Sequence, residues 1–310
     1  MSFDLYFAGS PCKEADELMV NLGCNRLFSQ ENDRKNISNW QKYKNSRRHQ
    51  YKGKIFIDSG AFSVHTKGIE LDVDAYIDYI NSIDEDVCLF AQADKIPGEF
   101  GKIKTRTQIS EAPKLSWENY IYMKDRIKSR DKLIPIFHQG EDFKWLKNML
   151  EYTHEDGTHI RYIGISPAND KHTNEKEVFI RECFEIIKNS SNPNVCTHAF
   201  GMTSLKVLER YPFTSADSTS WLMTGANGNI ITPYGLICIS DKSRSDFKNI
   251  FSMNKEAIET IDNYISKYGF TLEQASKDYK IRMMLNIYYL KEWSDNYTYK
   301  PIKCIKKHLF

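Results

Sequence analysis

The sequence of 310 residues has few of the features that mark special classes of protein. Its 15 glycines and 9 prolines are too few for a collagenous, linker-rich or largely disordered chain. No apolar run approaches the ~18 residues that a membrane-spanning helix needs, so we expect no membrane partner. The first residues carry acids and lack a basic segment followed by an apolar run, so they do not predict an export signal.

The seven cysteines are scattered, and none is spaced as C-x-x-C. This pattern predicts neither a disulfide framework nor a zinc knuckle, and we therefore expect a reduced, cytoplasmic protein. The sequence also lacks a large excess of charge of one sign, because 43 basic and 41 acidic residues give a net charge of +2. No global basic excess indicates nucleic-acid binding, but a local basic face is compatible with it.

Eight short apolar runs, rich in β-branched and aromatic residues, are each followed by a polar break: 4–9, 25–29, 54–58, 87–92, 133–138, 162–166, 195–200 and 213–217. Near-continuous apolar runs are typical of strands covered on both faces. Amphipathic helices are predicted between several of them, at 72–83, 142–152 and 174–189. This alternation predicts an α/β fold, a (β/α)8 TIM barrel. An open doubly wound sheet is the alternative, although Gly9-Ser10-Pro11 is not the glycine-rich phosphate turn such a sheet usually carries.

Three segments exceed what a plain barrel requires. Residues 95–115 read as a long basic loop after the fourth strand. Residues 221–250 contain a hairpin inserted after the eighth strand and entered near Asn227-Gly228. Residues 254–310 form a C-terminal helical part with apolar faces. We expect all of them to belong to one domain spanning 1–310.

Polar residues gather where the predicted strands end, which is where a barrel of this type carries its function. The main ones are Asp58, Asp94, Gln139, His198 and Asp217. An aspartate at a strand end is often only the cap of the next helix, but several on one rim favour displacement chemistry and recognition of a planar base. We expect His138 to point into packing or to lie between strand and helix. With no D-x-D or H-x-H pair at these ends, the sequence predicts no metal and no cofactor.

Clusters of basic residues provide a second candidate feature. We assign contacts with a nucleic-acid backbone to Lys102, Lys104 and Arg106 in the predicted loop, and to Lys242 and Arg244 after the hairpin. Interleaved with tyrosines, such clusters can follow a phosphate backbone. Each cluster alone is more often a solvated face.

Several of these segments resemble, in order, the motifs of the queuine/archaeosine tRNA-guanine transglycosylases. They are DSGAF at Asp58, FHQGE around Gln139, YIGIS around Gly164 and FTSAD ending at Asp217. The segment NGNIITPYGLICISDKS resembles the hairpin of that family, and KIRMMLNIYYLKEW resembles its closing helix. The resemblance extends over about residues 58–293. It implies a barrel that exchanges guanine in a polynucleotide for a free 7-deazaguanine.

The resemblance also implies roles for individual residues. Asp217 would be the nucleophile at C1′ of the sugar, and Asp58 the general acid/base. The base would be bound by Ser59, Gly60, Asp94, Gln139, Gly140, Gly164 and His198, with Gly164 acting through its backbone. A carboxylate nucleophile with a second carboxyl group to handle the proton fits a glycosidic displacement in two steps. An acid and an amide can pair with the edge of a flipped-out guanine.

The sequence departs from the tRNA enzymes in lacking their C-x-C-x-x-C zinc motif, since only Cys238 and Cys304 follow the eighth strand. In this it resembles the phage-type DpdA DNA-guanine transglycosylases, which favours DNA as the polymer and a free base such as preQ0 as co-substrate. For a viral protein, the compartment would be the host cytoplasm. The alternatives are the same exchange on tRNA, a non-catalytic nucleic-acid-binding barrel, and a barrel glycoside hydrolase. The sequence leaves open whether the protein works as a monomer or a homodimer.

Overall fold

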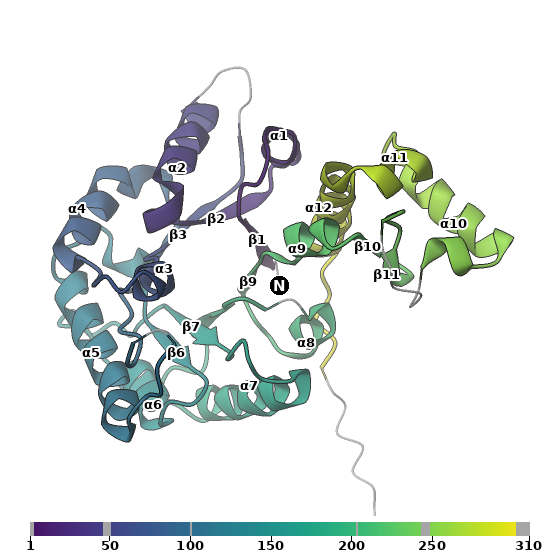
Figure 1. Ribbon diagram of the computed structural model, residues 1–310. Coiled ribbons are helices and arrows are strands. Elements are labelled where there is room, and N and C mark those ends of the chain that lie inside the picture. The colour runs from purple at the N-terminus through teal and green to yellow at the C-terminus, as the bar shows by residue number, and fades with distance from the viewer. Residues whose placement is uncertain (1–2, 46–50, 100, 203, 243–248, 302–310) are drawn as a thin grey trace, which may run out of the picture.

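The centre of the molecule is a parallel sheet rolled into a barrel and surrounded by helices (Figure 1). The structure is a computed structural model, and it describes residues 3–45, 51–99, 101–202, 204–242 and 249–301. The strands of the barrel are β1 Asp4–Ala8, β2 Asn25–Ser29, β3 Ile55–Asp58, β4 Leu89–Ala91, β5 Leu133–Ile134, β6 Ile136–His138, β7 Tyr162–Ser166, β8 Cys196–Ala199 and β9 Ser215–Ser218.

The sheet closes at Pro135, which divides one strand position into β5 and β6. The strand order is β5-β4-β3-β2-β1-β9-β8-β7-β6, so β5 pairs with β4 while β6 pairs with β7. Proline has no N–H to donate to a ladder, which accounts for the interruption. The nine segments therefore occupy eight strand positions. The predicted (β/α)8 barrel is confirmed, and the alternative of an open sheet is wrong.

Helices cover the outside of the barrel (Figure 1). They are α1 Lys13–Leu22, α2 Gln30–Asn45, α3 Ala61–Thr66, α4 Val73–Ile83, α5 Arg106–Lys124, α6 Lys144–Glu151, α7 Thr173–Lys188, α8 Leu205–Arg210, α9 Ser220–Ala226 and α12 Tyr279–Asp295. Short 3-10 turns lie at Asp84–Asp86, Arg130–Lys132 and Ile250–Ser252. Helix α12, at the end of the chain, packs against both α1 and α9, and so completes the outer ring. None of the helices in the described ranges has the length and apolar character needed to cross a bilayer.

Side chains alternate between the interior of the barrel and the layer under the helices, as strand geometry requires. The interior is filled by a cluster of buried residues: Tyr6, Ala8, Leu27, Phe56, Leu89, Ala91, Ile134 and Ile136. Residues of the opposite parity, such as Phe7, Ile57 and Phe137, belong to the larger core between strands and helices. The barrel is thus a packed core and not a channel.

The predicted hairpin is present after the eighth strand position, as β10 Asn229–Thr232 and β11 Gly235–Cys238. It is followed by α10 Lys255–Ser266 and α11 Leu272–Lys277. These elements share a small core of their own with one side of α12, including Ile230, Ile261 and Leu285. They form the lobe beside the barrel in Figure 1.

The predicted basic loop at 95–115 is only half correct, because helix α5 already begins at Arg106. Thr105 and Gln108 form a capping box, in which the Thr105 hydroxyl accepts from the Gln108 amide and the Gln108 side chain accepts from the Thr105 amide. The sequence TRTQ carries this signal, which fixes the start of the helix. Pro113 lies inside the same helix.

The contact between α9 and α12 predicts that any side chain at Gly225 destabilises the protein. A Cβ there would lie 2.7 Å from Cγ and 2.9 Å from the backbone nitrogen of Met283. Since backbone cannot move aside cheaply, we expect Gly225→Ala to lower the free energy of unfolding by about 1–3 kcal/mol, measured by urea denaturation. The neighbouring exposed substitution Ala226→Ser is the control and should change it by less than about 0.5 kcal/mol. Equal stability of the two variants would contradict this packing.

Candidate active site

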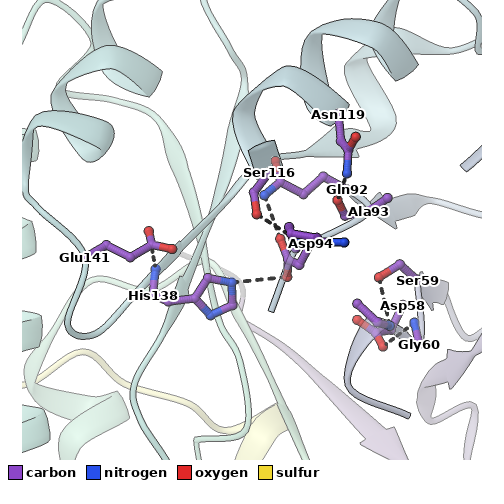
Figure 2. Close-up of polar contacts among 12 residues, drawn as sticks. Asp58, Ser59, Gly60, Gln92, Ala93, Asp94, Ser116, Asn119, His138 and Glu141 are labelled. Atoms are coloured by element: carbon purple, nitrogen blue, oxygen red, sulfur yellow. Dashed lines mark hydrogen bonds and ion pairs between the residues drawn. The ribbon is translucent and has the colours of Figure 1, made fainter. Parts of the chain in front are cut away.

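The barrel brings polar side chains from β3, β4, β6 and β9 to the rim where the strands end, and Figure 2 shows those at the ends of β3, β4 and β6. Asp58 ends β3, Asp94 follows β4, His138 ends β6 and Asp217 lies in β9. The charges of Asp94 and Asp217 both act on Asp58, so the three carboxylates form one electrostatic group. This mutual influence is in line with the predicted grouping of these acids at one rim.

Asp217 is anchored through one of its two carboxylate oxygens. Oδ1 accepts a hydrogen bond from the amide of Gly201 at 2.9 Å and contacts Nε2 of His198 at 3.2 Å. All hydrogen bonds that the described residues make to this carboxylate reach Oδ1. The side chain is 11% exposed. Oδ2 is therefore the oxygen available to a reacting atom.

His198 lies beneath Asp217 and has no exposed surface. Its Nδ1 contacts the hydroxyl of Ser215 at 2.6 Å, and its ring packs edge-to-face against Phe56 and Phe200. This burial contradicts the predicted contact between His198 and a base, because His198 has no exposed surface that a bound molecule could contact. The residue supports Asp217 instead.

Asp94 is held at both of its carboxylate oxygens. Oδ1 accepts from the side-chain amide of the buried Gln92 at 2.6 Å, and Oδ2 contacts Nε2 of His138 at 3.1 Å. Burial is the largest single effect on the pKa of His138 and lowers it, but the charge and hydrogen bond of Asp94, together with the charges of Glu141 and Asp58, raise that pKa to about 9. His138 therefore carries a positive charge at neutral pH.

His138 is a residue of the candidate site that the sequence analysis did not predict there. Our expectation that it packs between strand and helix is wrong, since Figure 2 shows its imidazole turned toward Asp94. The available signal was strand alternation, because His138 has the same parity as the interior residue Ile136. Glu141, whose side chain accepts from the amide of His138 at 3.1 Å, was also missed; burial raises its pKa to about 7.

Asp58 has no basic side chain on its carboxylate among the described contacts. Oδ2 accepts from the amide of Gly60 at 3.0 Å, within the DSG turn that Figure 2 shows. Burial raises the pKa of Asp58 to about 6, and the charges of Asp94 and Asp217 add to the rise. Ser59 and Gly60 thus shape the turn that holds Asp58, and Gly60 needs its left-handed φ of 75° there.

The other predicted base-binding residues are engaged elsewhere or stay untested. The side-chain oxygen of Gln139 accepts from the amide of Ala168 at 3.0 Å, which ties it to the loop after β7. Gly164 lies within β7, where its amide donates to Pro135 and a Cβ would come within 2.5 Å of the Phe200 ring. Gly140 is exposed in the turn after Gln139, with φ at 103°. Contacts of these residues with a base remain predictions.

A cavity of about 690 Å³ opens beside Asp94, between α3 with its following segment, the loop after β4 and the middle of α5. Its walls mix apolar groups such as Leu71 and Leu115 with charged ones such as Lys67 and Lys95. This volume is within the range of small-molecule pockets. No group of three or more His, Cys, Asp and Glu side chains suited to a metal ion occurs within the described part of the chain.

The predicted backbone-binding residues lie on two sides of the barrel. Lys102 and Lys104 are exposed in the loop before α5, where Lys102 pairs with Glu99 at 2.5 Å, and Arg106 is the exposed first residue of that helix. Lys242 is exposed and follows β11, a strand that lies on the other side of the barrel from α5 in Figure 1. Arg244 lies outside the described residues.

Comparison with known proteins does not place the chain in a family. No protein-family model matches it, and no curated protein matches it significantly. The transglycosylase resemblance therefore depends on the short motifs, and its functional content is a proposal.

The raised pKa of Asp58 predicts a pH-dependent gain in stability for Asp58→Asn. A carboxyl whose pKa rises from 3.8 to about 6 on folding opposes folding once it ionises, and this penalty is complete above pH ~6 and absent below pH ~4. We expect Asp58→Asn to be more stable than the parent by up to about 3 kcal/mol at pH 8, with the difference vanishing toward pH 4. Urea denaturation across this pH range measures it, and a difference that does not change with pH would contradict it.

The pair of Asp94 and His138 predicts a coupled titration. In Asp94→Asn the main source of the upward shift is gone while burial remains, so the pKa of His138 should fall from about 9 to below 6.5. Histidine NMR titration measures this change. Glu141→Gln is the comparison, because Glu141 acts on His138 more weakly than Asp94 and should give a smaller fall. The reverse order would show that Asp94 is not the main partner.

Proposed function

We propose that the protein is a guanine transglycosylase that exchanges guanine in DNA for a free 7-deazaguanine base through a covalent link to Asp217. The observation that carries the proposal is the division of three neighbouring carboxylates into three environments. Asp217 is fixed with one oxygen free, Asp94 is paired with a charged histidine, and Asp58 has a pKa of about 6. Displacement at a glycosidic carbon requires such a nucleophile and such an acid/base.

In the first step, Oδ2 of Asp217 attacks C1′ of the sugar as the bond to N9 of guanine breaks. The protonated carboxyl of Asp58 gives its proton to the departing base, which leaves as neutral guanine. In the second step, the Asp58 carboxylate takes the N9 proton of the incoming 7-deazaguanine. N9 then attacks C1′ and the ester to Asp217 breaks, so that protons balance over the cycle. A pKa near 6 suits a group that must both give and take a proton near neutral pH.

The two donors on Oδ1 favour the second step. The Gly201 amide and His198 bind Oδ1 more strongly when it belongs to a carboxylate than when it is the carbonyl of an ester. They therefore stabilise the carboxylate as it leaves C1′. They also fix the orientation of the group, so that Oδ2 faces the sugar in each cycle.

Asp94 and His138 supply complementary groups for a guanine edge. Each oxygen of Asp94 has accepted one hydrogen bond and can accept a second, which suits the N1–H and N2–H donors of guanine. The charged ring of His138, whose side chain is 36% exposed, provides a donor for a base oxygen. The ring of Phe200 is partly exposed at the same rim and offers a surface for stacking.

DNA is preferred to tRNA because the sequence lacks the zinc motif of the tRNA enzymes, to which it otherwise shows its resemblance. The exposed basic residues Lys102, Lys104 and Arg106 at and before the start of α5, and Lys242 after β11, supply positive charge for contacts with a phosphate backbone. Exchange on tRNA is the alternative that the same site chemistry supports.

The test is a base-exchange assay with labelled guanine and, in parallel, duplex DNA and unmodified tRNA. We expect label to enter DNA, and Asp217→Asn to lose at least about 10³-fold in rate, as when a covalent nucleophile is removed. Asp125→Asn, an exposed carboxylate at the end of α5, is the matched control and should keep the parental rate. Label in tRNA alone would overturn the choice of polymer. Turnover by Asp217→Asn would overturn the nucleophile.

A further inference from the structure

A line of hydrogen-bonding side chains runs from Asp217 down through the interior of the barrel. Below Asp217 and His198, the hydroxyl of Ser215 lies 2.6 Å from Nδ1 of His198 and 2.6 Å from the hydroxyl of Tyr162. Tyr162 lines a hollow of about 920 Å³ at the opposite face of the barrel, where the strands begin. The line therefore connects the candidate active site with the far face.

The surroundings of this line are apolar. His198 and Ser215 have no exposed surface, and the rings of Tyr6, Phe56 and Phe200 pack around the imidazole. In such an environment a hydrogen bond is strong, and a polar atom left without a partner is costly. The direction of each bond is therefore constrained by its neighbours.

With a neutral imidazole, one arrangement of protons satisfies every member of the line. Asp217 ionised can only accept, so Nε2 of His198 carries a proton and donates to it. In the neutral imidazole, Nδ1 then has a lone pair and accepts from the Ser215 hydroxyl. Ser215, having used its proton, accepts from the hydroxyl of Tyr162. The opposite tautomer would turn the Nε2 lone pair toward the Asp217 carboxylate and repel it.

We propose that Ser215 and Tyr162 are positioning residues for Asp217, which act through His198 by fixing the tautomer whose Nε2–H holds Oδ1. The part of this inference that concerns catalysis rests on the proposed function, whereas the tautomer is a property of the folded protein alone. Without the Ser215 hydroxyl, Nδ1 loses its donor and the proton is no longer confined to Nε2. Asp217 then loses a fixed contact and Oδ2 loses its fixed direction.

The experiment uses the full chain with ¹⁵N-labelled histidine, assigned by the loss of one signal set in His198→Gln. The variants are Ser215→Ala and Tyr162→Phe. Thr197→Val is the matched control, because Thr197 is the buried neighbour of His198 on β8 and its hydroxyl has no hydrogen-bond partner among the residues that the structure describes. The ring-nitrogen signals report the tautomer, and the base-exchange assay reports the rate.

We expect the parent and Thr197→Val to show His198 protonated at Nε2. Ser215→Ala should shift both ring nitrogens and lower the exchange rate about tenfold, the effect of one buried hydrogen bond. Tyr162→Phe, which keeps the ring and removes only the hydroxyl, should shift Nδ1 with a smaller loss of rate. If Ser215→Ala does not fold, the ring-nitrogen signals of Tyr162→Phe test the proposal.

Ring-nitrogen signals in Ser215→Ala and Tyr162→Phe that match those of Thr197→Val would overturn the proposal. A parent protein without exchange activity would overturn the proposed function. The ring-nitrogen signals would then still test whether Ser215 and Tyr162 fix the tautomer of His198. Altered signals with an unchanged exchange rate would show that the tautomer is set by Ser215 but does not position Asp217, and this outcome also overturns the proposal.

Discussion

Closure of the parallel sheet at the broken strand position β5/β6 is the constraint on which the site depends. Ile134 accepts from the amide of Gln92 on one side of Pro135, and Pro135 itself accepts from the amide of Gly164 on the other. These bonds join β4 to β7 across an interrupted strand. Since all strands of a closed parallel barrel end on one face, closure carries Asp58, Asp94, His138 and Asp217 to a common rim. An open sheet would have separated them.

Three carboxylates at one rim repel one another, and the protein resolves this by giving them unequal partners. Asp94 has a histidine that its own charge keeps protonated, and Asp217 has two donors on a single oxygen. Within the described part of the chain, Asp58 is bonded by backbone amides of its own turn and by no basic side chain, so burial and the charges of the other two acids raise its pKa. Such unequal environments are what the proposed roles of acid/base and nucleophile require of identical side chains. The division follows from which strand-end residues face inward.

The sequence predicted the eight strands and the acids at their ends, because apolar runs and strand ends are local patterns. It did not predict the start of α5 at Arg106, where the capping box at Thr105 was overlooked. His138 was missed for a different reason. Neighbouring residues of a strand face opposite sides, and the prediction named Gln139, whereas the side chain that contacts Asp94 is that of His138, one position earlier. The burial of His198 depends on Phe56 and Phe200, which are distant in sequence, and no local pattern reports such packing.

The interior of the barrel must satisfy two demands that oppose each other. Closure requires apolar packing, which Phe56, Leu89 and Ile136 supply, whereas an anchored Asp217 requires polar support from below. A single buried histidine in that layer would leave Nδ1 unsatisfied, at a cost comparable to a lost hydrogen bond. The Ser215 hydroxyl removes this cost, and Tyr162 completes the line at its lower end. The polar line is thus compatible with a packed barrel because each of its donors meets an acceptor, and this requirement fixes the geometry of Asp217 through the fold itself.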